Sequence, residues 1–172
     1  MEKKVKKSRV KKVITTLLLL SSLFGVSLYF GVTAQAAPPT GKKVKMSAYT
    51  MNGDFKGNFR KTLEVGNWEY AVLGTSSDGV YLDHEGLNIY TIRSVNPYTS
   101  GYDYWNFSTR GYIYLDTKSN AKRFVIVDKG DGYYKIFHNG IPINTYFWGG
   151  GILSYISVGE ASGYDETKWK FQ

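Results

Sequence analysis

Residues with the chemistry for catalysis are sparse in this sequence. The chain has no cysteine and two histidines, His84 and His138, and neither stands in an H-E-x-x-H motif or near a G-x-S-x-G elbow. Asp83 and Glu85 flank His84, but adjacent residues of a strand point to opposite faces, so this trio cannot act jointly without a bend. We therefore expect no enzyme activity and no cofactor.

Two aspartates, Asp128 and Asp131, raise the question of a metal site. Their spacing departs from the calcium-loop pattern and favours a plain turn, and we expect no metal site. A pair of glycosidase carboxylates remains open, because such pairs are defined in space and not along the chain.

Aromatic side chains lie near polar ones at several places in the sequence, and this pattern suits ligand binding better than catalysis. Sugars present flat apolar faces and directional hydroxyls, so their sites combine an aromatic platform with a few polar groups. Trp148 precedes three glycines, which cannot bury it locally, and each other aromatic has core or cross-strand packing as its alternative. The predicted ligand-binding residues are Tyr81, Asp83, Asp131, Tyr133, Asn139 and Trp148.

The N-terminus has the order of a secretory signal peptide. Seven Lys or Arg residues within 3–12 precede an apolar run over 13–32, and Ala34 and Ala36 form an A-x-A site. The pattern predicts a signal helix over 1–36, cleavage after Ala36 and a secreted product, and it resembles a Gram-positive bacterial leader. The alternative is a retained membrane anchor, since 20 apolar residues could span a bilayer.

Without this leader the chain is nearly neutral, with fifteen basic against thirteen acidic residues. We expect a linker and basic arm over 37–46, in which Lys42, Lys43 and Lys45 contact an anionic cell wall or membrane surface. A solubilising terminal segment is the alternative. No basic stripe continues into the domain over 47–172, which argues against nucleic acid, and the sequence leaves the oligomeric state open.

Alternating apolar residues and frequent turns predict an all-β domain, as a sandwich, barrel or trefoil. Asn139-Gly140 is a strong signal for a type I′ hairpin. Trp105, Phe124 and Trp169 are assigned to the core, together with Ile136 and Ile143. The predicted cross-strand pairs are His138 with Ile141, Phe137 with Pro142, Ile136 with Ile143, and Tyr134 with Thr145.

Two short motifs recur in this domain. A turn glycine followed by aromatic and aliphatic residues appears at Gly79, Gly111 and Gly132, and Trp-x-aromatic appears at Trp68, Trp105 and Trp169. The stretch over 124–171 resembles one repeat of a ricin-type β-trefoil lectin, and residues 47–172 have the length of three such units. The family's Gln-x-Trp is replaced, since Thr167 stands two residues before Trp169. The resemblance implies a single β-trefoil, and a sandwich resembling a carbohydrate-binding module is the alternative.

The function predicted from these features is that of a secreted, non-catalytic protein that binds a glycan or another cell-surface receptor. The alternative is a secreted antimicrobial or cytolytic toxin, since β-trefoils resembling this one are receptor-binding parts of such proteins. A protease inhibitor is a third class, for which the sequence identifies no reactive loop.

Overall fold

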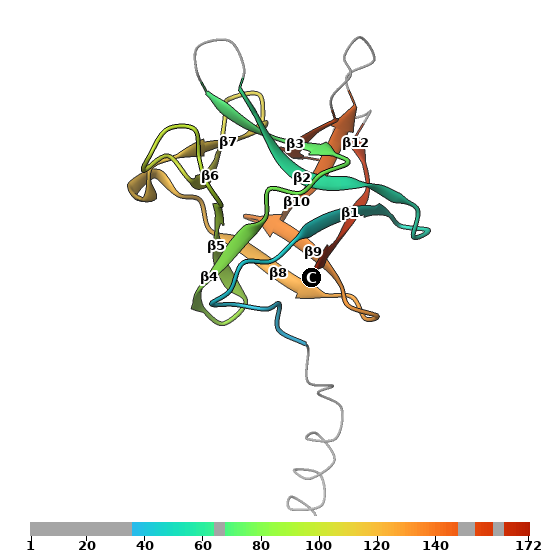
Figure 1. Cartoon of the computed structure of the whole chain (residues 1–172). Helices are drawn as coiled ribbons and strands as arrows, with labels where there is room; N and C mark the ends of the chain where they lie inside the picture. The colour runs from blue at the N-terminus through green and yellow to red at the C-terminus, as the bar shows by residue number, and fades with distance from the viewer. Residues whose placement is uncertain (1–35, 64–67, 148–153, 160–163) are drawn as a thin grey trace, which may run out of the picture. The chain divides into compact units, whose positions relative to one another are not determined.

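A computed structural model describes residues 36–63, 68–147, 154–159 and 164–172. Within these residues the chain forms thirteen β-strands and one 3-10 turn, η1 (Lys118–Asn120). The all-β prediction is therefore confirmed (Figure 1). The predicted signal helix lies outside the described residues.

The strands fall into three consecutive units. The first unit contains β1 (Met46–Thr50), β2 (Phe55–Leu63), β3 (Glu69–Gly74) and β4 (Val80–Gly86). The second contains β5 (Ile89–Ser94), β6 (Tyr104–Phe107), β7 (Ile113–Asp116) and β8 (Phe124–Asp128). The third contains β9 (Tyr133–His138), β10 (Ile141–Phe147), β11 (Ser154–Val158), the short β12 (Tyr164–Asp165) and β13 (Thr167–Phe171).

Strand pairing repeats from unit to unit. The first strand of each unit pairs with its second, and the second pairs with its third. The last strand of each unit pairs with the first strand of the next, as β4 with β5, β8 with β9, and β13 with β1. The first and last strands also meet within each unit, at β5–β8, at β9–β13 and at the bridge between Val44 and Val80. The first and last strands of the three units thus form a closed ring, and the fold is a β-trefoil.

The third strands of the three units meet at one end of this ring. Tyr70 of β3 pairs with Tyr114 of β7, and Val72 of β3 pairs with Tyr155 of β11. A bridge between Tyr112 and Ser157 completes the triangle. β3 and β7 lie at the top of Figure 1, away from the segment that leads into β1. This triangle, which we call the cap, brings together strands that are far apart in the sequence.

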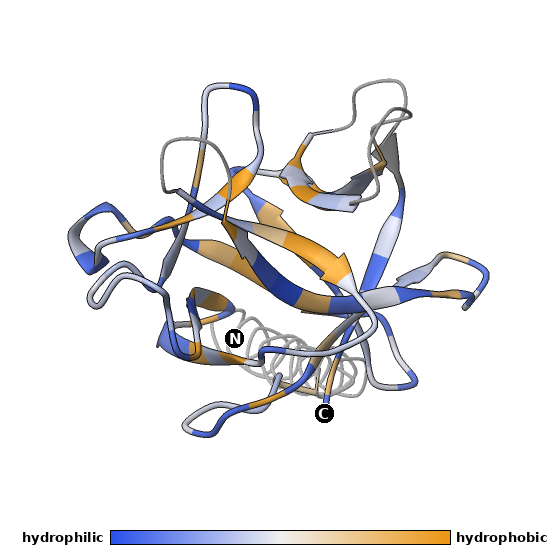
Figure 2. Ribbon diagram, turned by 45° about the horizontal axis from the view of Figure 1, so that its top comes forward, coloured by the Kyte–Doolittle hydropathy of each residue, from blue (hydrophilic) through white to orange (hydrophobic). Residues whose placement is uncertain are grey.

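The core lies inside the ring and beneath the cap. Hydrophobic and hydrophilic residues alternate along the strands (Figure 2), so one face of each strand contributes to the core. The side chains of Trp105, Phe124 and Trp169 are fully buried, as are those of Ile136 and Ile143. The core prediction for these residues is confirmed.

The predicted hairpin is correct at its turn and wrong beyond it. Asn139 and Gly140 have φ values of 49° and 79°, as a type I′ turn requires. The pairs of His138 with Ile141 and of Phe137 with Pro142 are present. The next predicted pairs, Ile136 with Ile143 and Tyr134 with Thr145, do not form. β9 turns to pair with β13, while β10 turns to pair with β11 and β12.

The segment predicted as a linker and basic arm forms backbone hydrogen bonds with the first unit and with the end of the third. Val44 is buried and exchanges two backbone hydrogen bonds with Val80, and Lys45 exchanges two with Gln172. Lys42 and Lys43 are exposed, as is Lys45. The backbone of this segment therefore belongs to the fold, while its lysines face solvent.

Candidate functional site

Tyr81 and Asp83, two of the predicted site residues, lie on β4 beside Arg93 of β5. The Arg93 guanidinium carbon lies 4.4 Å from the centre of the Tyr81 ring, and Arg93 Nε lies 3.4 Å from Asp83 Oδ2. Arg93 also approaches Asp103, at 3.8 Å. Both predicted residues thus share one basic partner within the protein.

Asp131 and Tyr133 lie at the turn between β8 and β9. Lys168 Nζ lies 4.1 Å and Lys170 Nζ 5.3 Å from the centre of the Tyr133 ring, which also contacts the ring of Tyr49 at 5.2 Å. Asp131 is exposed and has a left-handed φ of 54°. The ring of Tyr133 is therefore already engaged by lysines and a neighbouring aromatic.

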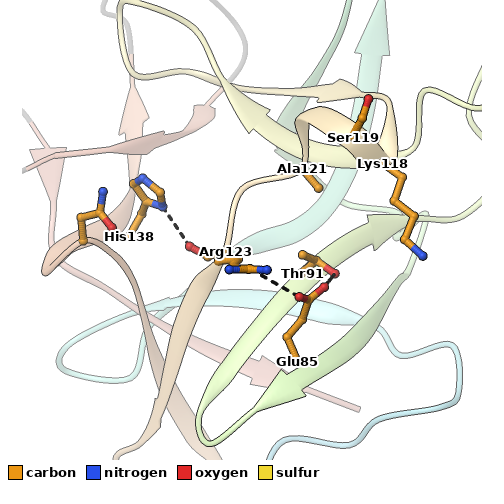
Figure 3. A pocket seen from close by; sticks show the side chains of 8 residues that line it. Glu85, Thr91, Lys118, Ser119, Ala121, Arg123 and His138 are labelled. Atoms are coloured by element: carbon orange, nitrogen blue, oxygen red, sulfur yellow. Dashed lines mark hydrogen bonds and ion pairs between the residues drawn. The ribbon is translucent and has the colours of Figure 1, made fainter.

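Asn139 is one of the residues that line a polar pocket of about 440 Å³ (Figure 3). Glu85, Arg123 and His138 also line this pocket, and each comes from a different one of the three units. The five predicted residues that the structure describes therefore lie in three separate places, with Tyr81 beside Asp83, Asp131 near Tyr133, and Asn139 in the pocket. Trp148 lies outside the described residues.

The structure instead gathers aromatic rings on the outer side of the cap. We call this group the aromatic surface. It comprises Trp68, Tyr70, Tyr112, Tyr114, Tyr146 and Tyr155. Trp68 is 43% exposed, and the five tyrosines are partly buried. Partly exposed rings have a face that solvent, and therefore a ligand, can reach.

The six rings form a continuous chain of contacts. The ring centre of Trp68 lies 5.1 Å from that of Tyr114, and Tyr114 lies 6.3 Å from Tyr70. Tyr70 lies 6.2 Å from Tyr155, which lies 5.2 Å from Tyr112. Tyr112 in turn lies 6.1 Å from Tyr146. These spacings are those of attractive aromatic pairs, so neighbouring rings hold one another in place.

A hydrogen-bond network below the rings fixes Tyr114. Its hydroxyl donates to Asp116 Oδ2 at 3.1 Å and accepts from Asn106 Nδ2 at 3.0 Å. Burial raises the pKa of the Tyr114 hydroxyl, and the hydrogen bond to Asp116 and its negative charge add to this. Tyr114 therefore remains neutral at physiological pH, with a carboxylate directly behind it.

Local sequence explains half of this arrangement. Trp68 and Tyr70 are two residues apart, as are Tyr112 and Tyr114, so each pair lies on one face of its strand. Sequence reasoning did not combine these pairs, because only the pairing of the third strands brings them together. Exposed aromatic residues at positions i and i+2 on the third strand of each trefoil unit are the signal that would have found them.

The residues considered for catalysis have separate partners. His84 Nε2 is hydrogen-bonded to the carbonyl of Leu87, Asp83 pairs with Arg93, and Glu85 pairs with Arg123. Among the described residues, no cluster of three His, Asp or Glu side chains is placed to hold a metal ion. Within the same residues, no helix has the length and apolarity needed to cross a membrane.

Comparison with known proteins supports the fold and no narrower assignment. No family model matches the chain, and no curated protein matches its sequence. Two lysenin structures, of the lysenin pore and of lysenin with phosphocholine, are each 20% identical with a TM-score of 0.57. They cover 82% and 80% of this chain and 49% and 47% of the lysenin chains, so this chain spans about half of lysenin.

Two protease inhibitors have similar structures over nearly their whole length. Trypsin inhibitor 1 from Senna obtusifolia is 13% identical, with a TM-score of 0.58 over 83% of this chain and 91% of the inhibitor. The double-headed arrowhead protease inhibitor A, in complex with two trypsins, is 12% identical with a TM-score of 0.58, over 84% and 96%. At these identities the likeness establishes a shared fold alone.

Proposed function

We propose that this chain is a secreted, non-catalytic binding protein that attaches to a cell-surface glycan through its aromatic surface. The observation that carries this proposal is the continuous chain of six rings on the cap. Aromatic rings at a binding surface provide a large apolar contact, and tyrosine hydroxyls add hydrogen bonds at their edges. The ricin-type resemblance also implies a sugar ligand, and Trp68, Tyr70, Tyr112 and Tyr114 of the aromatic surface belong to the two motifs that recur in the sequence.

The rings also suit a second ligand, a quaternary ammonium head group of a membrane lipid. Cations are attracted to the faces of Trp and Tyr rings, and the Asp116 carboxylate behind Tyr114 adds negative charge at that point. Lysenin, whose fold is similar, has been solved with phosphocholine. This ligand corresponds to the alternative function of a membrane-directed toxin.

The test compares Trp68→Ala with a control, Tyr98→Ala. Trp68 is 43% exposed within the aromatic surface, while Tyr98 is 68% exposed on the loop between β5 and β6. Loss of an aromatic anchor is expected to weaken binding by about 1–3 kcal/mol, and the control is expected to bind normally. Binding is measured by co-sedimentation with insoluble cell-wall polysaccharide and with phosphatidylcholine vesicles.

The two ligands give different outcomes in this experiment. A glycan-binding protein sediments with the polysaccharide only, and a lipid-directed protein sediments with the vesicles and releases an enclosed dye. In either case the Trp68 variant must be the weaker one. Equal binding by both variants would remove the aromatic surface as the site.

A further inference from the structure

The polar pocket beside Asn139 differs in chemistry from the aromatic surface. It lies between the β4–β5 hairpin, the turn η1 and the β9–β10 turn (Figure 3). Its lining includes two cations, Lys118 and Arg123, and no ring of Phe, Tyr or Trp. Ser119 and Thr91 add hydroxyl groups. A neutral sugar would lack the aromatic platform that sugar sites use, so the charges determine what this pocket can hold.

The positive charges in the pocket outnumber the negative ones. Glu85 is the one carboxylate in the lining, and it is engaged by Arg123 Nε at 3.4 Å and by the Thr91 hydroxyl at 3.3 Å. Arg123 retains further N–H donors after this contact, because a guanidinium has five. No ion pair of the Lys118 ammonium occurs within the described part of the chain. The pocket therefore carries unneutralised positive charge.

His138 lies on the side of Arg123 opposite to Glu85, and its ring has a fixed orientation (Figure 3). Its Nδ1 lies 2.9 Å from the Arg123 carbonyl oxygen, and because a carbonyl only accepts, Nδ1 must carry the hydrogen. The centre of the ring lies 4.8 Å from that of Phe107 and 5.9 Å from that of Phe124. With Nδ1 used in this way, Nε2 is the ring nitrogen left for another partner.

From this placement we infer that the pocket binds a tetrahedral oxyanion, a phosphate or sulfate group carried on a larger molecule. Arg123 supplies planar N–H donors and Lys118 a compact charge, the two groups that proteins use for such anions. Hydroxyl and amide donors from Ser119 and Asn139 lie in the same lining. A volume of about 440 Å³ leaves room for the molecule that bears the anion.

The two histidines provide a direct test by NMR. The imidazole of His138 lies in the pocket, whereas His84 is hydrogen-bonded to Leu87 outside its lining and serves as an internal reference. The protein is titrated with inorganic phosphate at constant pH and at an ionic strength of about 0.15 M. We expect a saturable shift of the His138 ring signals and none at His84.

Variants separate a specific site from general charge attraction. Lys118→Ala and Arg123→Ala should each weaken phosphate binding at least about five-fold, and Glu85→Gln should strengthen it because a competing negative charge is lost. Lys129→Ala removes one exposed positive charge outside the pocket and should leave binding unchanged. No shift at His138, or an equal loss in the Lys129 variant, would overturn the inference.

Two further titrations distinguish the source of the anion. Soluble glycerol phosphate reports a free ester, and phosphatidylcholine vesicles with added phosphatidylglycerol report a lipid head group. The source that reaches the pocket is the one whose binding is weaker in the Lys118→Ala variant and unchanged in the Lys129→Ala variant. This result is independent of the proposed function, because the pocket variants leave the aromatic surface intact.

Discussion

Asp116 lies behind the aromatic surface and accepts a hydrogen bond from the hydroxyl of Tyr114. Asn106 and Tyr114 donate hydrogen bonds to its Oδ2, and the backbone N–H of Thr117 donates to its Oδ1 at 2.7 Å. Asn120 donates to both oxygens, at 3.2 Å. Burial by itself would raise the pKa of Asp116, but these hydrogen bonds together lower it below its ordinary value. The folded state therefore stabilises the charged form of Asp116.

This network predicts that Asp116→Asn destabilises the protein in a pH-dependent way. At pH 7 the amide replaces an acceptor oxygen with a donor, which faces Asn106 and Tyr114, and the cost is about 1.5–3 kcal/mol. Because the folded pKa is lowered, the contribution of Asp116 is present above about pH 4 and is lost as the pH falls through its folded pKa. Urea unfolding of both proteins at a series of pH values measures this. A difference that stays constant in acid would contradict the assignment of a charged Asp116.

Three tryptophans with the same local motif have different surroundings. Trp105 and Trp169 are fully buried, as their sequence predicted, while Trp68 is 43% exposed. They belong to different positions within their units, since Trp105 lies on β6, Trp169 lies on β13 and Trp68 precedes β3. The motif indicates a strand with aromatic residues, but the position of that strand in the trefoil decides which side is covered.

At the level of strands and turns, two glycines allow a matched comparison. Gly140 and Gly111 have similar φ values of 79° and 82°. A Cβ on Gly140 would meet nothing within 4 Å, whereas one on Gly111 would lie 2.8 Å from the carbonyl oxygen of Val158. The first position needs glycine for its backbone conformation alone. The second also needs it for the close approach of β11 to the turn before β7.

We therefore expect Gly111→Ala to destabilise the protein more than Gly140→Ala. Left-handed backbone costs an alanine about 1–2 kcal/mol in either variant, and in the Gly111 variant the clash with Val158 is added to this cost. Denaturant unfolding of both variants measures the difference. Equal losses would show that the chain around Val158 moves away at little cost. No loss at Gly140 would argue against the type I′ turn.

The sequence predicted strands and one turn well because both depend on neighbouring residues. The alternation of apolar residues predicted the all-β class. Asn139-Gly140 predicted the turn, because left-handed φ values are a local property of the chain. The pairs beyond Phe137 were wrong because strand pairing depends on the tertiary fold, in which β9 turns to pair with β13 and β10 turns to pair with β11 and β12. The aromatic surface was missed for the same reason, since its rings come from β3, β7, β10, β11 and their flanks.

Over the whole molecule, the three-fold arrangement is a property of the backbone and not of the repeated motifs. Gly79 precedes the fourth strand of the first unit, Gly111 the third strand of the second, and Gly132 the first strand of the third. The trefoil prediction was correct, although these motifs do not occupy equivalent positions. Chain length and the alternation of strands and turns are the features that predicted the trefoil correctly.

Closure of the strand ring depends on the segment before β1. β1 itself begins at Met46, and the contact between the first and fourth strands of its unit is the bridge from Val44 to Val80. The hydrogen bonds of this bridge measure 2.8 and 2.9 Å, and the Val44 side chain is 1% exposed. The other two units make the equivalent contact between named strands. The segment over 37–45 thus supplies the last link of the ring.

This role gives a prediction that compares a chain beginning at Ala37, the expected mature start, with one beginning at Met46. The shorter chain loses the buried Val44 and the four backbone hydrogen bonds of Val44 and Lys45, so its free energy of unfolding should fall by about 4–8 kcal/mol. Val44→Ala in the longer chain should cost about 1–3 kcal/mol. Replacing Lys42 and Lys43 by alanine, which changes exposed side chains only, should stay within about 0.5 kcal/mol. Guanidinium unfolding measures all four proteins. If the chain beginning at Met46 were as stable as the longer one, the segment would be a dispensable linker and its lysines its only functional part.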